Sequence, residues 1–127
     1  MNVVDSSGWL EYFANGRNAD FFAPALADPA ELIVPAVSIF EVFKRVLEQR
    51  GEAAALRASV LMQQGRVEVL DASSAMVAAK LSHELKLPMA DSIMLATARR
   101  FDAELWTQDA DFAGLPGVHY LPKPAAD

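Results

Sequence analysis

Five carboxylate side chains stand where the chain passes between expected strands and helices: Asp5, Glu41, Asp91, Asp109 and Asp111. Asp5 follows a short apolar strand, and Asp109 and Asp111 follow another. Glu41 and Asp91 fall in the first turns of expected helices. Because no histidine or cysteine accompanies them, these oxygen donors suit Mg²⁺ or Mn²⁺ and not zinc.

A cluster of these carboxylates would need a cation to stay ionised. Two carboxylates ~5 Å apart repel each other by roughly 3 kcal/mol at an effective dielectric constant of about 20. A protein-bound Mg²⁺ ion keeps several waters and takes further ligands from substrate phosphates. In phosphodiester hydrolysis one such ion lowers the pKa of the attacking water, and a second, where present, stabilises the leaving oxygen. We therefore expect metal-assisted hydrolysis if these positions meet in the fold.

Short apolar runs alternate with amphipathic segments and predict the elements that would position the acids. The expected strands are residues 2–4, 31–34, 66–70, 104–107 and 118–121. The expected helices are residues 7–14, 18–27 with an interruption at Pro24, 37–50, 52–64, 73–85 and 89–101. This alternation is typical of an α/β fold, here a mostly parallel five-stranded sheet flanked by helices on both faces. Since such sheets bind ligands beyond the carboxyl ends of their strands, we expect the acids to converge there.

Each acid also has a purely structural interpretation. Asp5 could cap the following helix by accepting its orphan N–H groups. Glu41 lies three residues after Ser38, and Ser-x-x-Glu is the capping-box pattern of a helix start. Asp91 suits a helix N-terminus, but its helix is apolar nearly all round, so a carboxylate there must be paired or hold a metal. The aspartates after the fourth strand are common loop residues.

Composition limits the class of protein without fixing its function. The 127 residues are 53% hydrophobic and include no cysteine. We expect one domain over 1–127 with a loose tail over 121–127, and the apolar excess indicates a surface buried against a partner or a second copy. No apolar run is long enough for a bilayer and no signal-peptide pattern is present, so a cytoplasmic protein is expected. The net charge of −6 weakens a nucleic-acid interpretation without removing it, because bound cations would invert the local field.

Four blocks of sequence resemble the PIN domain, and within that family the VapC-like toxins of bacterial toxin–antitoxin pairs. In chain order they are VVDSSGWLEYF, PAVSIFEVF, LPMADSIMLATAR and LWTQDADF, and they span residues 3–112. The acids of the family pattern fall on Asp5, Glu41, Asp91 and Asp109.

The resemblance implies a role for each of these positions. Asp5, Asp91 and Asp109 would hold the principal metal, and Glu41 would hold or orient a second ion or the attacking water. The small hydroxyl residues of the pattern fall on Ser6 or Ser7 and on Thr107, and we expect Ser6 and Thr107 to be hydrogen-bond partners of the acids. Asp111 would lie beside the fourth ligand or replace Asp109 in that place.

The resemblance also implies partners. Such proteins look like Mg²⁺- or Mn²⁺-dependent endoribonucleases that form homodimers and are silenced by a cognate antitoxin. Aromatic residues of the first two helices would line part of an antitoxin groove or form ordinary core: Trp9, Tyr12, Phe13, Phe21 and Phe22. The basic residues are thinly spread and define no RNA track. The following residues could contact phosphates or could form a solvated face: Arg17, Lys44, Arg45, Lys86, Arg99 and Arg100.

Other classes of protein fit the sequence less well. The main alternative is a non-catalytic α/β regulatory module that binds metal or protein, such as a receiver-like domain with Asp5 as phosphoacceptor. A receiver has paired acids before its acceptor and a lysine after its last strand, and neither is found here. A phosphatase of the haloacid-dehalogenase type needs an aspartate two residues after its nucleophile, where this chain has Ser7.

Overall fold

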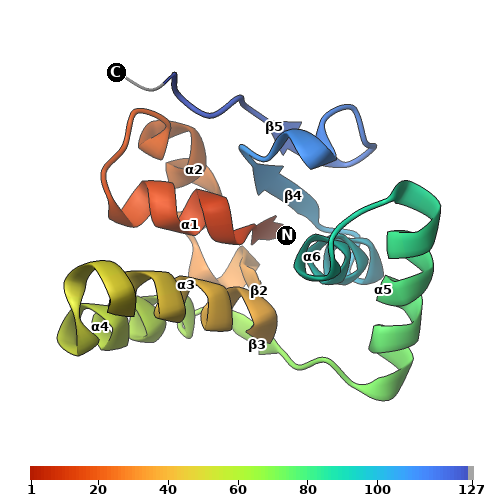
Figure 1. Cartoon of the computed structure of the whole chain (residues 1–127), viewed down its shortest axis with the longest axis horizontal. Helices are drawn as coiled ribbons and strands as arrows, with labels where there is room; N and C mark the ends of the chain where they lie inside the picture. The colour runs from red at the N-terminus through yellow and green to blue at the C-terminus, as the bar shows by residue number, and fades with distance from the viewer. Residues whose placement is uncertain (126–127) are drawn as a thin grey trace.

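The computed structural model describes residues 1–125 of the chain as six helices around short strands (Figure 1). The strands are β1 (Asn2–Val4), β2 (Ile33–Pro35), β3 (Arg66–Glu68), β4 (Glu104–Thr107) and β5 (Val118–Tyr120). The helices are α1 (Ser6–Phe13), α2 (Ala19–Leu26), α3 (Ala36–Arg50), α4 (Glu52–Met62), α5 (Ala72–Leu85) and α6 (Met89–Arg100). Within the described residues, no helix combines the length and apolar character that crossing a bilayer requires.

All strand pairings are parallel, as expected. One sheet has the order β1-β4-β5, and β2 pairs with β3 separately. A single bridge between Asn2 and Leu32 joins the two sets. The α/β prediction is confirmed, but the prediction of one continuous five-stranded sheet is wrong, because the strands bond as three plus two. Strands this short form few ladder bonds, and Pro35 at the end of β2 has no N–H to donate.

Helices cover both faces of the strands, which confirms the predicted layering. Val3 and Ile33 are fully buried in one core cluster with side chains of α5 and α6. Their neighbours Val4 and Val34 are fully buried in a second cluster with side chains of α1, α2, α3 and α4. Adjacent residues of a strand point to opposite faces, so these two pairs mark the two sides of the sheet. Figure 1 shows the same division, with α5 and α6 on one side.

Most elements begin or end within one or two residues of the prediction, and three of the differences have a clear physical reason. Residues 29–31 form a 3₁₀ turn capped by Asp28, so the second strand begins only at Ile33. The third strand ends at Glu68, and the next residue, Val69, is 70% exposed. Helix α2 runs without interruption through Pro24, since burial of its apolar side offsets the one lost hydrogen bond.

The aromatic residues of the first two helices lie mainly in the core. Trp9 and Phe22 are buried in the cluster of α1 to α4, and Phe13 and Phe21 pack against it. Tyr12 is the exception, with 40% of its surface exposed. The core interpretation of these aromatics is therefore the one that the structure favours.

Gly8 allows α1 to approach the core closely. A Cβ atom at this position would lie 2.6 Å from Cε1 of Phe22 and 2.7 Å from Cγ1 of Val4. We expect Gly8→Ala to lower the free energy of unfolding by about 1–3 kcal/mol through overpacking. Helix propensity alone predicts the opposite sign, because alanine is the better helix former. Urea unfolding of the variant decides between them, and an unchanged or higher midpoint would contradict the packing argument.

Candidate active site

The carboxyl ends of β1 and β4 bring Asp5 next to Thr107. Val4 pairs with Trp106 in the parallel ladder, and the Asp5 N–H donates to the Trp106 carbonyl oxygen at 3.1 Å. Asp5 is therefore the first residue beyond one strand, and Thr107 is the last residue of its neighbour. Both side chains are buried, with 3% and 0% exposure. The expected position of Asp5 at this edge of the sheet is what the structure shows.

The Asp5 carboxylate is held by three donors. The Gly8 N–H donates to Oδ1 at 2.8 Å, which is the helix cap that the sequence suggested. The Thr107 hydroxyl donates to Oδ2 at 2.6 Å, and the Ser7 hydroxyl donates to Oδ1 at 2.8 Å. Asp5 is thus both a cap and a member of the carboxylate group, so the two interpretations of this residue are not exclusive.

Three further aspartates lie together beside Asp5. Asp91, in the first turn of α6, Asp109 and Asp111 each offer an oxygen atom, and these atoms lie within 4.8 Å of one another. The Asp109 N–H donates to Oγ1 of Thr107 at 2.9 Å, and the Asp111 N–H donates to Oδ1 of Asp109 at 2.9 Å. Thr107 therefore fixes both Asp5 and the loop that carries the other two acids.

Glu41 is not part of a capping box. Helix α3 begins at Ala36, and the buried Ser38 donates to the Pro35 carbonyl oxygen at 2.6 Å. Glu41 instead accepts a hydrogen bond of 2.6 Å from the Ser6 hydroxyl, which links α3 to the start of α1. The structure places Ser6 as a partner of Glu41. Ser7, which was not chosen for this role from the sequence, holds Asp5, and its place two residues after the capping acid is the signal that could have found it.

Burial and hydrogen bonding act in opposite directions on Asp5. Burial raises the pKa of Asp5 to about 6, and the negative charge of Asp109 adds to the rise. The hydrogen bonds from Thr107, Gly8 and Ser7 lower it, because they stabilise the ionised form. Asp5 therefore carries a high pKa in spite of three donors.

The pKa of Asp91 is affected by the other four candidate acids. The pKa of Asp91 is raised to about 7, most of all by burial and then by the negative charges of Asp109, Asp5, Asp111 and Glu41, in that order. The four acids that repel Asp91 come from distant parts of the chain. Each of these four acids therefore lies within electrostatic reach of Asp91.

The donor set fits a hard divalent cation. Asp91, Asp109 and Asp111 supply only carboxylate oxygens, which are the ligands of Mg²⁺ and Mn²⁺ in proteins. A cation among them would neutralise the repulsion that raises the pKa of Asp91. From the sequence, Asp5 and not Asp111 is the expected third ligand. The assignment of Asp5 as a direct ligand stays a prediction, while Asp111 is close enough to be a ligand itself.

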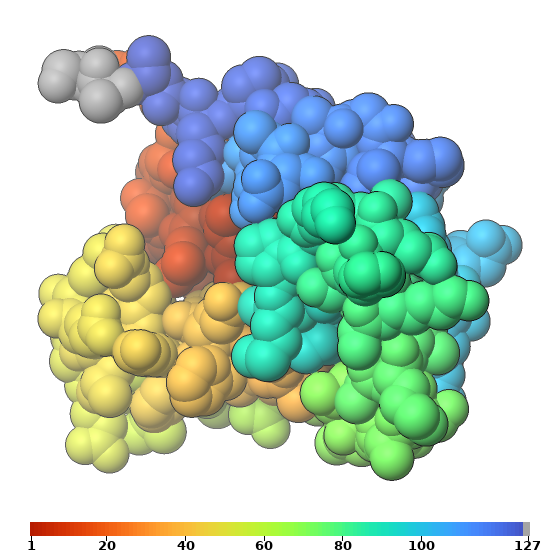
Figure 2. All heavy atoms as spheres, turned by 45° about the vertical axis from the view of Figure 1, so that its right-hand side comes forward, coloured from red at the N-terminus to blue at the C-terminus, as the bar shows by residue number. Residues whose placement is uncertain are grey.

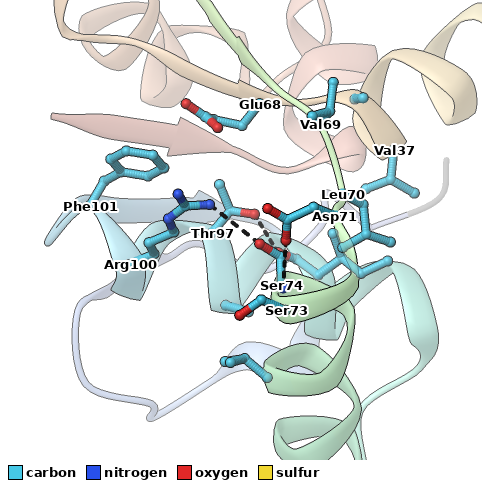
Figure 3. Close-up of a pocket in the computed structure, with 14 residues that line it drawn as sticks. Val37, Glu68, Val69, Leu70, Asp71, Ser73, Ser74, Thr97, Arg100 and Phe101 are labelled. Carbon is cyan, nitrogen blue, oxygen red and sulfur yellow. Dashed lines mark hydrogen bonds between the residues drawn. The ribbon is translucent and has the colours of Figure 1, made fainter.

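A separate hollow of about 240 Å³ lies along α6 from Ile93 to Arg100 (Figure 3). It is lined by the β3–α5 connection and by the last turns of α6, including Thr97 and Phe101. Within it Arg100 donates to Ser74, whose N–H is capped by Asp71. None of the five candidate acids lines this hollow, so it is separate from the candidate active site.

Comparison with protein-family models places this arrangement in a known family. The model of the PIN domain matches residues 3–118, which is most of the chain. The chain belongs to the PIN domain family. The resemblance inferred from the four sequence blocks is thus confirmed. A search of curated protein sequences finds no match.

Several solved structures share this PIN fold over nearly their whole length. A toxin–antitoxin complex from Klebsiella pneumoniae has a chain that is 26% identical, with a TM-score of 0.79 over 94% of this chain and 96% of that one. The VapC20 toxin of Mycobacterium tuberculosis, which cleaves the sarcin–ricin loop, gives 20% identity and a TM-score of 0.77 over 93% and 97% of the two chains. DNA-bound VapBC from Salmonella typhimurium gives 11% identity and a TM-score of 0.70 over 96% of this chain and 97% of that one. The last two show likeness of fold alone.

Proposed function

We propose that this PIN domain is a Mg²⁺- or Mn²⁺-dependent endoribonuclease and the toxin component of a type II toxin–antitoxin system. The observation that carries the proposal is the meeting of Asp91, Asp109 and Asp111 beside Asp5 and Glu41. An all-carboxylate group of this kind suits a hard cation and the hydrolysis of phosphodiesters. The likeness to toxins and toxin–antitoxin complexes supports this choice of chemistry and of biological setting.

Each residue then has a definite task. When bound, the divalent cation supplies charge neutralisation at the phosphate and a water of lowered pKa. Asp91 and Asp109 would hold it, with Asp5 or Asp111 completing the ligand set. Thr107 keeps Asp5 and Asp109 in place through its two hydrogen bonds. Glu41, oriented by Ser6, positions the attacking water or a second ion.

The proposal includes partners. We assign RNA as substrate, a cognate antitoxin protein as inhibitor, the cytoplasm as location and a homodimer as the assembled state. Large apolar side chains stay exposed on the single chain, among them Phe40 at 65% and Met89 at 74%, which supports burial against another protein. Light scattering tests the dimer, with a mass twice that of the 13.8 kDa chain expected.

The test of the function is metal-dependent cleavage of RNA. The purified chain, without antitoxin, is incubated with a pool of end-labelled RNAs in Mg²⁺, in Mn²⁺ and in excess EDTA. We expect cleavage with either metal, none in EDTA, and recovery when Mg²⁺ is added back in excess. Cleavage that persists in EDTA would contradict the carboxylate–metal mechanism. A chain that binds Mn²⁺ but cuts no RNA would favour the non-catalytic regulatory module instead.

A further inference from the structure

Two hollows that share lining residues lie beside Glu41 and Ser7 of the candidate active site. The larger, about 490 Å³, lies between α1, α3 and α4, and the smaller, about 330 Å³, lies between α1 and α3. They share Leu10 and Arg45 as lining residues. Glu41 lines the smaller hollow, and Ser7, which donates to Asp5, lines the larger. The two hollows therefore form one groove that reaches the candidate active site at Glu41 and Ser7; we call it the α3–α4 groove.

The α3–α4 groove gathers cationic side chains on a chain of net charge −6. The larger hollow is lined by a single carboxylate, Glu11, and by four cationic residues: Arg45, Arg50, Arg57 and Lys123. The smaller hollow adds one cation, Lys44, and two carboxylates, Glu41 and Glu48, so the positive charge is concentrated in the larger hollow. All four cationic residues are exposed, and none takes part in a hydrogen bond or ion pair among residues 1–125. Their charges are thus available to an anionic ligand. No such track was predicted from the sequence, because these positions are brought together by three separate elements.

The C-terminal segment completes one wall of the groove. The Asn18 side chain donates to the Pro122 carbonyl oxygen at 2.9 Å and to the Gln108 side chain at 3.0 Å. Lys123, the next residue, therefore lies at the rim, within the region predicted as a loose tail; residues 126 and 127 of that region lie outside the described part. In Figure 2 the red surface of α1 lies between the yellow surface of α3 and α4 and the dark blue surface of this segment.

The groove also has an apolar part, which we call its apolar floor. Leu10, Phe13 and Leu61 contribute this apolar surface to the same hollow as the cationic side chains. A single RNA strand can place unstacked bases against apolar and aromatic side chains while arginine and lysine contact its phosphates. A double helix presents mainly phosphates and would leave the apolar floor unused. The combination therefore fits a single strand.

We propose that the α3–α4 groove binds the backbone of a single-stranded RNA segment and leads it to the carboxylates. This inference rests on the proposed nuclease function. An acidic peptide would also match the charge, but a substrate strand must reach the candidate active site, and the smaller hollow extends the groove to Glu41. Arg45 lines both hollows, so it lies between the larger hollow and the part of the groove that Glu41 lines.

The test compares two double variants with equal loss of charge. Arg50→Ala/Arg57→Ala removes two groove residues, and Lys80→Ala/Arg99→Ala removes two exposed residues of α5 and α6. Binding of a labelled single-stranded RNA is measured in EDTA across a range of salt, so the RNA stays intact. We expect the slope of log K against log salt to fall by about 1.4 for the groove variant and hardly at all for the control. With Mg²⁺, KM for cleavage should rise about tenfold with kcat within about twofold.

The outcomes separate this inference from the proposed function. If the parent chain cuts RNA and the groove variant binds and cuts it equally well, the RNA track is wrong and the nuclease remains. The track is equally wrong if that variant loses only its affinity for an acidic antitoxin segment. If the parent cuts nothing but its RNA affinity in EDTA depends on Arg50 and Arg57, the nuclease proposal fails and the groove remains an RNA site. Equal melting temperatures of all variants exclude misfolding.

Discussion

Asp91→Asn should abolish metal-dependent RNA cleavage while making the metal-free protein more stable. A lost ligand removes several kcal/mol of transition-state stabilisation, so a drop in kcat on the order of 10³-fold is expected. The stability gain follows from the pKa of Asp91, which burial and four neighbouring acids raise to about 7. At about pH 8 Asp91 is ionised in both states, but only in the folded state does its charge meet burial and the neighbouring negative charges, which lowers the stability of the folded state. Removing the charge should add on the order of 1 kcal/mol, discounted for solvent screening of a partly exposed group, or about 5 °C in Tm.

Asp102→Asn is the matched control for this variant. Asp102 is exposed and has a left-handed backbone with φ of 51°, a conformation that asparagine also adopts readily. It loses the same charge outside the cluster and should keep both activity and Tm. Activity is measured with Mg²⁺ and Tm in EDTA. An Asp91→Asn protein that cuts RNA at the parental rate, or one that melts lower than the parent, would contradict the account of the cluster.

Mg²⁺ should stabilise the parent protein far more at about pH 8 than at about pH 5. The folded-state pKa values of Asp5 and Asp91, about 6 and about 7, lie above the ordinary value of 3.8. Stability from these two groups is therefore fully present below about pH 4 and is lost as the pH rises through 6 and 7. Above that range both carboxylates are ionised, and a bound cation restores the folding stability that their repulsion removed. Below it protons and Mg²⁺ compete for the same oxygens.

Thermal unfolding with Mg²⁺ and with EDTA, over a series of pH values, measures this effect. In EDTA the Tm of the parent should decline between about pH 5 and pH 8, and the gap between the Mg²⁺ and EDTA curves should widen over the same interval. The Asp91→Asn variant should show a smaller decline and a smaller gap. A Mg²⁺ effect of equal size at both ends of the range would mean that Asp5 and Asp91 do not share a cation.

The sequence predicted most of the architecture because its local signals agree with its tertiary packing. Apolar pairs such as Val3–Val4 and Ile33–Val34 mark strands buried on both faces, and the structure buries them so. It could not predict how the strands divide into sheets, because ladder bonds in elements of three residues depend on their spatial offset. Nor did it show that α2 tolerates Pro24, since that depends on the partners of its buried side.

The sequence pointed to the acidic residues of the candidate site but not to the hydrogen bonds that hold them. Asp5, Glu41, Asp91 and Asp109 were identified from their places at the ends of strands and starts of helices. The choice between Ser6 and Ser7 as partner of Asp5 required the direction of each hydroxyl at the first turn of α1. The position of Asp111 beside Asp91 depends on the turn after β4, which local sequence leaves undetermined.

Direct titration of Mn²⁺ into the metal-free protein tests the central claim, that these carboxylates form one site for a hard divalent cation. Calorimetry at about pH 8 on the parent, Asp91→Asn and Asp102→Asn gives the binding constants. We predict saturable binding to the parent and to Asp102→Asn, weakened at least about tenfold by Asp91→Asn. Absence of saturable binding to the parent, or equal affinity in all three proteins, would contradict the account.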